Sequence, residues 1–259
     1  MNENSIVSPS KTKSTLTWTL ILLFLWGSAY QTGATLTDVF VGIPEMGEIL
    51  VQMVPPDWAY FDRIYGDMFQ TIRMALLGAT FGAILAIPLS LFSAYNVFPS
   101  SWVVQPARFV LNILRTIPDL LLAAIFVAIF GLGIIPGIFA LTIFSLGIIA
   151  KLTYEFVETI DPGPMEAMTA VGANKIQWIF FSVIPQVSAQ FAAYFLYTFE
   201  INIRAAAILG LVGAGGIGMH YKSTLGFLRY DQMSSIILLT LVVVMVIDFI
   251  TKKIREKLL

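Results

Sequence analysis

The chain has 259 residues, of which 58% are hydrophobic and 12% are charged, and its formal net charge is −1. Ordinary soluble domains carry about 25% charged residues, so this composition excludes a water-exposed surface of the usual kind. The near-neutral charge does not indicate a nucleic-acid partner, and the absence of cysteine excludes disulfides and thiolate metal sites.

Six segments are apolar enough to suggest membrane-spanning helices, which need about 20 mostly apolar residues to cross the hydrocarbon layer. The six segments cover residues 16–31, 69–95, 109–132, 134–154, 187–210 and 233–250. The stretch 208–230 is apolar and rich in glycine, and it is suited to entering the membrane without crossing it. The sequence therefore predicts an all-α polytopic membrane protein with six transmembrane helices.

The first segment begins like a signal peptide, because Lys11 and Lys13 precede an apolar run. No small-residue cleavage site closes it convincingly. Trp18, Trp26 and Tyr30 suit the headgroup region beside an anchored helix. We therefore expect this segment to be retained as a transmembrane helix.

Basic residues near both termini predict the orientation. Lys11 and Lys13 precede the first segment, and residues 252–259 contain four basic side chains. Cytoplasmic flanks of membrane helices are enriched in lysine and arginine, and an even number of spans leaves both termini on one side. Both termini are therefore expected in the cytoplasm. The loop 32–68 then lies outside, with six acidic residues and a single base, Arg63.

The loop 155–186 between the fourth and fifth segments is cytoplasmic by the same parity. Pro162, Gly163 and Pro164 form a turn, and Pro164 suits the first turn of a new helix. Gly172 ends or bends that helix, and a second short amphipathic piece leads to Pro185. Such a helix either packs on its own bundle or is gripped by a partner.

Within this loop, Glu166 and Ala167 are followed by Gly172, six residues after the glutamate, and then by Ile184 and Pro185. This pattern resembles the EAA…G…LP signature of the membrane subunits of ABC importers. The departures are mild, such as isoleucine in place of leucine, and the spacing is that of the family.

Two further stretches narrow the resemblance. LRTIPDLLLAAIF (114–126) and FEINIRAAAILGLVGAGGIG (199–218) are similar to the corresponding parts of phosphonate importer permeases. Methionine-type importers share a looser version, chiefly the VGAGGIG end. The resemblance to the importer fold covers about residues 69–251, and the part before it agrees only in layout.

The resemblance implies a methionine-importer-like core of five helices, preceded by one extra N-terminal helix. It divides the chain into residues 1–68 (cytoplasmic tail, first helix and acidic external loop), 69–251 (permease core) and 252–259 (basic cytoplasmic tail). The coupling segment, 155–186, is expected to dock into a groove of a cytoplasmic ABC ATPase. The residues that the resemblance assigns to this coupling are Glu166, Ala167, Gly172, Ala173, Ile184 and Pro185.

In this family two permease copies enclose one path, with an ATPase dimer below and a solute-binding protein outside, in the bacterial cell membrane. The resemblance therefore implies a homodimeric, lipid-embedded transport subunit that is not an enzyme and has no cofactor of its own. The implied cargo is phosphonate, or a related oxyanion such as phosphite or phosphate, delivered by an external phosphonate-binding protein. A methionine-type or other small-solute importer is the alternative.

An intramembrane enzyme is a remote alternative, because it needs a nucleophile with a base, or a pair of carboxylates, close in space. The chain has one histidine and no repeated acids within its apolar segments. His220 has no second metal ligand at a recognisable spacing, so we expect no metal site. A channel is a further alternative, but a channel needs no ATPase, so the coupling segment argues against it.

Charged residues in the apolar segments are candidates for the translocation path. Glu200 and Arg204 lie four residues apart, on one face of a helix, and ionisable residues at membrane depth usually face a bundle interior or a water-filled path. Two interpretations remain open: a structural ion pair, or an arginine that assists anion passage. Arg115, at the start of the third segment, either reaches the cytoplasmic headgroups or forms part of a gate or subunit contact.

The glycines at 210–218 allow three interpretations. Gly213, Gly215 and Gly218 match the dinucleotide-binding pattern G-x-G-x-x-G, but no alternating strands and helices surround them. Tight helix packing through small residues is the second interpretation. The third, which we favour, is an unwound or re-entrant segment lining the path, with backbone N–H groups open to an anion; its residues are Gly213, Gly215, Gly216 and Gly218.

Overall fold

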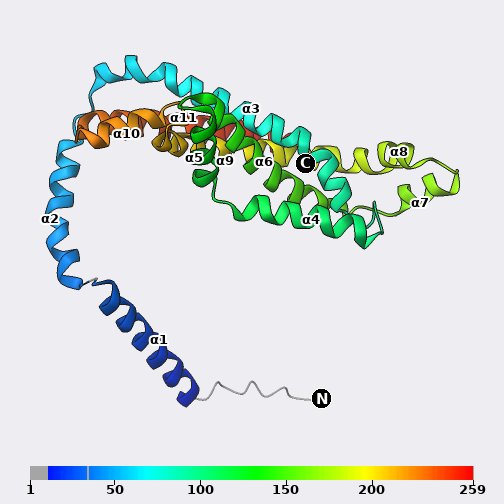
Figure 1. Cartoon of the computed structure of the whole chain (residues 1–259), viewed down its shortest axis with the longest axis horizontal. Coiled ribbons are helices and arrows are strands. Elements are labelled where there is room, and N and C mark those ends of the chain that lie inside the picture. Colours follow the sequence, from blue (N-terminus) through cyan, green and yellow to red (C-terminus); the bar gives the residue numbers. More distant parts are fainter. Residues whose placement is uncertain (1–10, 34, 259) are drawn as a thin grey trace. The chain divides into compact units, whose positions relative to one another are not determined.

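A computed structural model describes residues 11–33 and 35–258 of the chain. Throughout these ranges, all regular elements are helical (Figure 1). The chain divides into two compact units, Met1–Val54 and Pro55–Leu259. The all-α class is thus confirmed, and the second unit contains all the candidate site residues.

The first unit contains α1 (Lys11–Thr32) and α2 (Leu36–Gln52). A capping box begins α2, because the Thr35 side chain accepts a hydrogen bond from the Asp38 N–H and the Asp38 carboxylate accepts one from the Thr35 N–H. Large apolar side chains of both helices are exposed, among them Phe24 and Phe40.

The second unit contains four helices that are long and apolar enough to span a membrane on their own. They are α3 (Phe61–Ser93), α6 (Ile134–Val157), α9 (Ile184–Leu209) and α11 (Tyr230–Leu258). A bent pair, α4 (Ser101–Thr116) and α5 (Asp119–Phe130), raises the total to five if it counts as one span. The described helix α1 is not among them, so the expected number of six is not confirmed.

The bend between α4 and α5 differs from the continuous span expected over residues 109–132. The two helices meet at 86°. Pro118 lacks an N–H group, and its ring disfavours a helical conformation at Ile117, which is extended at φ −80° and ψ 122°. The proline therefore interrupts an apolar run that composition alone suggests is one helix.

The centre of the unit is a close contact between α3 and α6. A Cβ atom added to Gly82 would lie 2.4 Å from the Ser145 Cβ and 2.9 Å from the Leu146 nitrogen. One added to Gly78 would lie 2.5 Å from the Leu141 Cβ. Small residues let the two backbones approach, which is the usual way that membrane helices gain contact.

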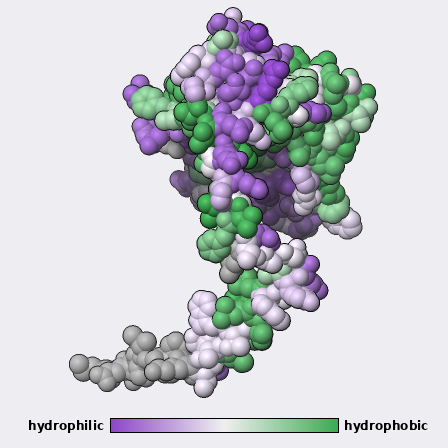
Figure 2. Space-filling view, turned by 90° about the vertical axis from the view of Figure 1, so that its left-hand side faces the viewer, coloured by the Kyte–Doolittle hydropathy of each residue, from purple (hydrophilic) through white to green (hydrophobic). Residues whose placement is uncertain are grey.

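Two short helical regions occupy opposite ends of this unit (Figure 1). At one end are α7 (Gly163–Ala170) and α8 (Lys175–Trp178), followed by one π-helical turn, η2 (Ile179–Val183), that leads into α9. At the other end lies α10 (Gly218–Gly226). Between the ends, side chains such as Phe81 and Met245 are exposed, as expected for helices that face lipid. Figure 2 shows apolar surface beside hydrophilic patches on one face.

Candidate functional site

The coupling segment folds as two short helices because its sequence starts and stops each of them. Pro164 stands in the first turn of α7, where a missing N–H costs nothing. Gly172 then adopts a left-handed φ of +73°, which glycine accepts without strain. Asn174 and Gln177 form a capping box that begins α8. The turn and the two helices expected from the sequence are therefore present, whereas the π-helical turn after α8 was not foreseen.

The residues assigned to coupling lie on this segment and on the first turn of α9. Most are exposed: Glu166, Ala167, Gly172, Ile184 and Pro185, with Ala173 partly covered. Apolar side chains are exposed beside them, including Val171 at 77% and Ile176 at 79%. Exposed apolar residues around a carboxylate form a surface suited to a protein partner.

The coupling segment is anchored to the rest of the unit by Trp178 and Lys175. The indole N–H of Trp178 donates to the Met165 carbonyl oxygen over 2.9 Å, which joins α8 to α7. The ammonium of Lys175 donates to the Val97 carbonyl oxygen and lies 4.0 Å from the centre of the Trp178 ring. Val97 belongs to the loop between α3 and α4, so two segments far apart in sequence are tied together here. Sequence reasoning missed both anchors, although a lone lysine in an apolar stretch was a signal.

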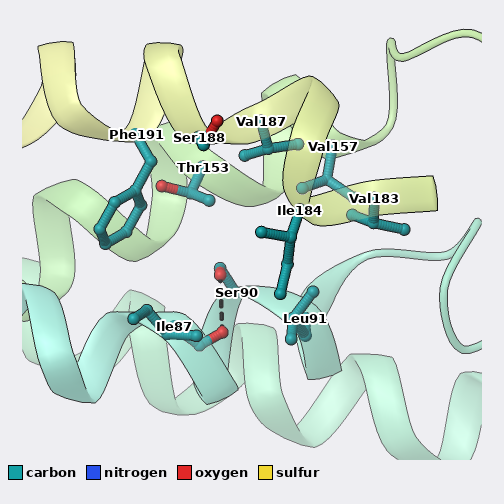
Figure 3. Close-up of a pocket in the computed structure, with 10 residues that line it drawn as sticks. All are labelled: Ile87, Ser90, Leu91, Thr153, Val157, Val183, Ile184, Val187, Ser188 and Phe191. Carbon is teal, nitrogen blue, oxygen red and sulfur yellow. Dashed lines mark hydrogen bonds between the residues drawn. The ribbon is translucent and has the colours of Figure 1, made fainter. Parts of the chain in front are cut away.

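A cavity of about 190 Å³ lies where the coupling segment joins the bundle. Figure 3 shows its lining, with Leu91 from α3, Val157 from α6 and Ile184 from α9 pointing toward one another. Its few polar groups are engaged or isolated: the Ser90 hydroxyl donates to the Ile87 carbonyl oxygen, and the Thr153 hydroxyl has no partner among the described residues. This space is apolar and adjoins the π-helical turn.

Glu200 and Arg204 form the ion pair that their spacing predicts. Arg204 Nη2 lies 2.5 Å from Glu200 Oε1, and Arg255 Nη2 of α11 lies 3.5 Å from Glu200 Oε2. The Glu200 side chain is 8% exposed and that of Arg204 is 50% exposed. The carboxylate is therefore held between two cations while Arg204 stays accessible, an arrangement compatible with both interpretations of the arginine.

Asn202, two residues before Arg204, is fully buried and was not singled out from the sequence. Its amide donates to the Ser145 hydroxyl over 2.7 Å and to the Ala75 carbonyl oxygen over 3.3 Å. These bonds connect α9 with α6 and α3. Because buried polar groups in membrane helices need partners, this contact fixes the packing of all three helices.

Arg115 lies in the last turn of α4, just before the bend. Its side chain packs on α6 at Gly147, where an added Cβ would lie 2.8 Å from the Arg115 Cγ. The aliphatic part of the Arg115 side chain therefore covers Gly147, while Arg115 as a whole remains exposed. A gating role stays a prediction.

The glycine-rich segment is neither a continuous helix nor an open loop. After α9 comes a single turn, η3 (Gly210–Val212), and Gly213, Gly215 and Gly216 adopt left-handed backbone conformations. The six residues 213–218 are all buried. The chain thus breaks here, as expected, and packs tightly as well.

Two N–H groups of this segment already have partners from α3. The Gly216 N–H donates to Gln70 Oε1 over 3.2 Å, and the Ile217 N–H donates to Thr71 Oγ1 over 2.8 Å. These two groups hold the segment on α3 and are not open to an anion. The contacts of these two N–H groups therefore do not support the suggested contact between backbone and anion. A role of the glycines in the translocation path stays a prediction.

Gly218 provides a test of this packing. A Cβ added there would lie 2.2 Å from the Ala207 carbonyl oxygen and 2.6 Å from the Gly210 Cα. Because both neighbours are backbone atoms, Gly218→Ala is expected to destabilise the protein by roughly 1–3 kcal/mol. The measurement is the thermal midpoint of the purified protein in detergent. Gly226→Ala is the matched control, because nothing lies within 4 Å of its added Cβ in the same helix. Equal midpoints for the two variants would contradict the proposed packing.

Comparisons with known proteins agree with this geometry. Residues 86–258 match the family of binding-protein-dependent transport system inner membrane components. The chain is 32% identical over 237 residues to the phosphite transport system permease protein PtxC of Stutzerimonas stutzeri, covering 92% of this chain and 85% of that protein. It is 38% identical over 219 residues to the phosphate-import permease protein PhnE of Mycolicibacterium smegmatis, covering 83% of this chain and 40% of that longer protein.

A solved structure shares the fold. An inward-facing structure of the MetNI methionine ABC transporter superposes with a TM-score of 0.67 at 22% identity, over 76% of this chain and 96% of that one. At this identity the likeness concerns the fold alone.

Proposed function

Since the chain belongs to the family of binding-protein-dependent transport system inner membrane components, we propose that it forms the path for a phosphorus oxyanion in an ABC importer. It is a multi-pass membrane protein and a permease subunit, not an enzyme, and the family works with an ATPase and a solute-binding protein. The proposed cargo is phosphonate, phosphite or phosphate. The observation that carries it is the identity to permeases named for phosphite and phosphate import.

Two identical copies would enclose the path, with an ATPase dimer on the α7–α8 side and a phosphonate-binding protein at the α10 end. The C-terminus would then lie in the cytoplasm of a bacterium, since α11 runs from the α10 end and finishes with a segment, 252–257, that contains four basic residues. With α1 as a sixth span, the N-terminus would lie on the same side. The exposed surface around Glu166 and Ile176 supports docking of the ATPase.

In the proposed cycle, the binding protein delivers its ligand to an outward-facing path. ATP binding brings the ATPase subunits together and draws the two coupling segments with them, and hydrolysis resets the assembly. The chain itself makes and breaks no bonds. Its contribution is to convert displacement of α7 and α8 into helix movement.

The test is uptake by proteoliposomes that contain the permease, its ATPase and its binding protein. Uptake of labelled methylphosphonate or phosphite, dependent on ATP and on the binding protein, is expected. Uptake of methionine, with none of either oxyanion, would assign the chain to an amino-acid importer. Oxyanion uptake that needs no ATP would instead indicate a channel.

Arg204 is the path residue to test first. The half-exposed guanidinium offers a planar fork suited to an oxyanion. If it assists passage, Arg204→Ala lowers oxyanion uptake about tenfold or more, equal to at least about 1.4 kcal/mol, while ATP hydrolysis continues, and Arg204→Lys recovers part of it. Uptake at the normal rate by Arg204→Ala would make the arginine a purely structural partner of Glu200.

A further inference from the structure

The end of the second unit that carries α10 contains a cavity of about 320 Å³. Its walls come from η1 (Trp58–Tyr60), the start of α3, α10 and the start of α11. The side chains that matter for its chemistry are Tyr60, Arg63, His220, Arg229 and Gln232. Helix α10, which forms one of these walls, lies at the opposite end of the unit from α7 and α8 (Figure 1).

Two arginines line this cavity, and neither forms an ion pair with a carboxylate in the part of the chain that the structure describes. Both arginines lie within electrostatic range of the Tyr60 hydroxyl, as do Asp57 and Asp67. Arg63 is the sole basic residue of the acidic segment 32–68. Two guanidinium groups therefore line one small cavity, and no carboxylate of the described residues is paired with either of them.

Two acids that lie near the Tyr60 hydroxyl, Asp57 and Asp67, are engaged with other groups. Asp67 Oδ2 lies 2.6 Å from His220 Nε2. Asp57 Oδ1 accepts hydrogen bonds from the N–H groups of Ala59 and Tyr60, and its Oδ2 accepts a long one, 3.4 Å, from Gln232. Neither carboxylate lines the cavity. Asp67 is hydrogen-bonded to His220 and Asp57 to the backbone of η1, and neither forms an ion pair with the guanidinium group of Arg63 or Arg229.

The walls of the cavity are fixed by hydrogen bonds. Tyr60 Oη lies 2.9 Å from His220 Nδ1, so the histidine bridges Tyr60 and Asp67. The Arg229 N–H donates to the Thr224 carbonyl oxygen over 2.9 Å. Leu228, immediately before Arg229, has a left-handed φ of 53°, a conformation that non-glycine residues rarely adopt and that recurs at ligand sites. The turn that carries Arg229 is thus held in one shape.

These contacts point to a ligand. The planar forks of two guanidinium groups match the oxygens of a tetrahedral oxyanion, and a cavity of about 300 Å³ or more admits a small molecule. We propose that the cavity between η1, α3, α10 and α11 is a receiving site that binds the phosphorus oxyanion between Arg63 and Arg229 before it enters the path. This inference rests on the proposed function and adds a recognition site in the permease itself. Binding is weak, because cargo in transit must also leave.

The test measures binding of methylphosphonate to the full permease–ATPase complex in phosphatidylcholine nanodiscs, without the binding protein, by titration calorimetry. The double variant Arg63→Gln with Arg229→Gln should weaken methylphosphonate binding at least tenfold. With lysine in place of glutamine at position 229, part of the lost affinity should return. Lys222→Gln is the matched control, since Lys222 is an exposed cation of α10 that does not line the cavity. Binding by the double variant equal to that of the unmodified chain overturns the proposal, and so does equal weakening by Lys222→Gln.

Two further measurements test whether a lipid headgroup or the binding protein occupies the cavity instead. Weaker methylphosphonate binding in nanodiscs that contain phosphatidylglycerol would assign the cavity to a lipid headgroup and overturn the proposal. Loss of binding-protein association in the double variant, with methylphosphonate binding intact, would assign the arginines to docking and also overturn it.

Failure of this inference is distinguishable from failure of the proposed function. If proteoliposomes take up methionine and no oxyanion, the proposed function fails. The binding experiment would still show whether methylphosphonate affinity depends on the two arginines. If they take up methylphosphonate while the double variant still binds it normally, the function stands and the receiving site does not.

Discussion

Replacing Gly82 with leucine is expected to prevent most of the protein from reaching its folded state. The added side chain would begin 2.4 Å from the Ser145 Cβ and 2.9 Å from two backbone atoms of α6, the Leu146 nitrogen and the Thr142 oxygen. Rotamer changes cannot move backbone atoms, so α3 and α6 must separate along their contact. Overpacking of this kind costs roughly 1–3 kcal/mol and occasionally more, and here it acts at the centre of the helix bundle.

The measurement is the monodisperse yield and thermal midpoint of each variant in detergent. Gly66→Leu is the matched control, because Gly66 lies in the same helix with nothing within 4 Å of an added Cβ. Gly82→Ala should fall between the two, since it adds the first clashing atom only. Equal yields for leucine at positions 66 and 82 would show that the α3–α6 contact is not required for folding.

Replacing Gly172 with valine is expected to weaken the association with the ATPase without unfolding the bundle. The position is open, with nothing within 4 Å of an added Cβ, so no clash contributes. The φ of +73° is the obstacle, because a β-branched residue in the left-handed region is strained by about 1–3 kcal/mol. Relief of that strain moves α7 relative to α8, and each 1.4 kcal/mol lost at the interface weakens binding about tenfold.

The check is the affinity of the purified permease for the ATPase, with uptake measured in parallel. Gly172→Asn is the matched control, since asparagine tolerates the left-handed conformation. It should bind the ATPase almost as well as the unmodified chain. If the valine variant assembles normally and hydrolyses ATP without transport, the defect lies in transmission. If it both assembles and transports normally, the segment does not depend on the conformation of Gly172.

The sequence predicted the position of a helix correctly where residues within or next to that helix determine it. The apolar runs locate α3, α6, α9 and α11, and the proline–glycine turn and Gly172 delimit α7. Residues 109–132 were predicted as one span, with Pro118 suited to a helix start or a kink, because the apolar run is long; the 86° bend at this proline was not predicted. Helix α3 begins at Phe61, earlier than expected, because charged residues continue the helix beyond its apolar part.

Contacts between distant parts of the chain could not be predicted in this way. The bonds of Asn202 to α3 and α6, and of Lys175 to Val97, join residues that no spacing rule connects. The role of Gln70 and Thr71 in holding residues 216–217 is equally non-local. The ion pair of Glu200 and Arg204 was predictable, since it lies within one helix, whereas the participation of Arg255 was not.

The tie between Lys175 and Val97 has a mechanical consequence. Through the chain alone, a pull on α8 would reach only the helices on either side of the coupling segment, α6 and α9. Through Lys175, the same pull also acts on the α3–α4 loop. Since α3 and α6 are in close contact at Gly78 and Gly82, both connections lead to the same pair of helices. We therefore expect the stroke of the ATPase to tilt α3 and α6 together as a single lever, with little sliding between them.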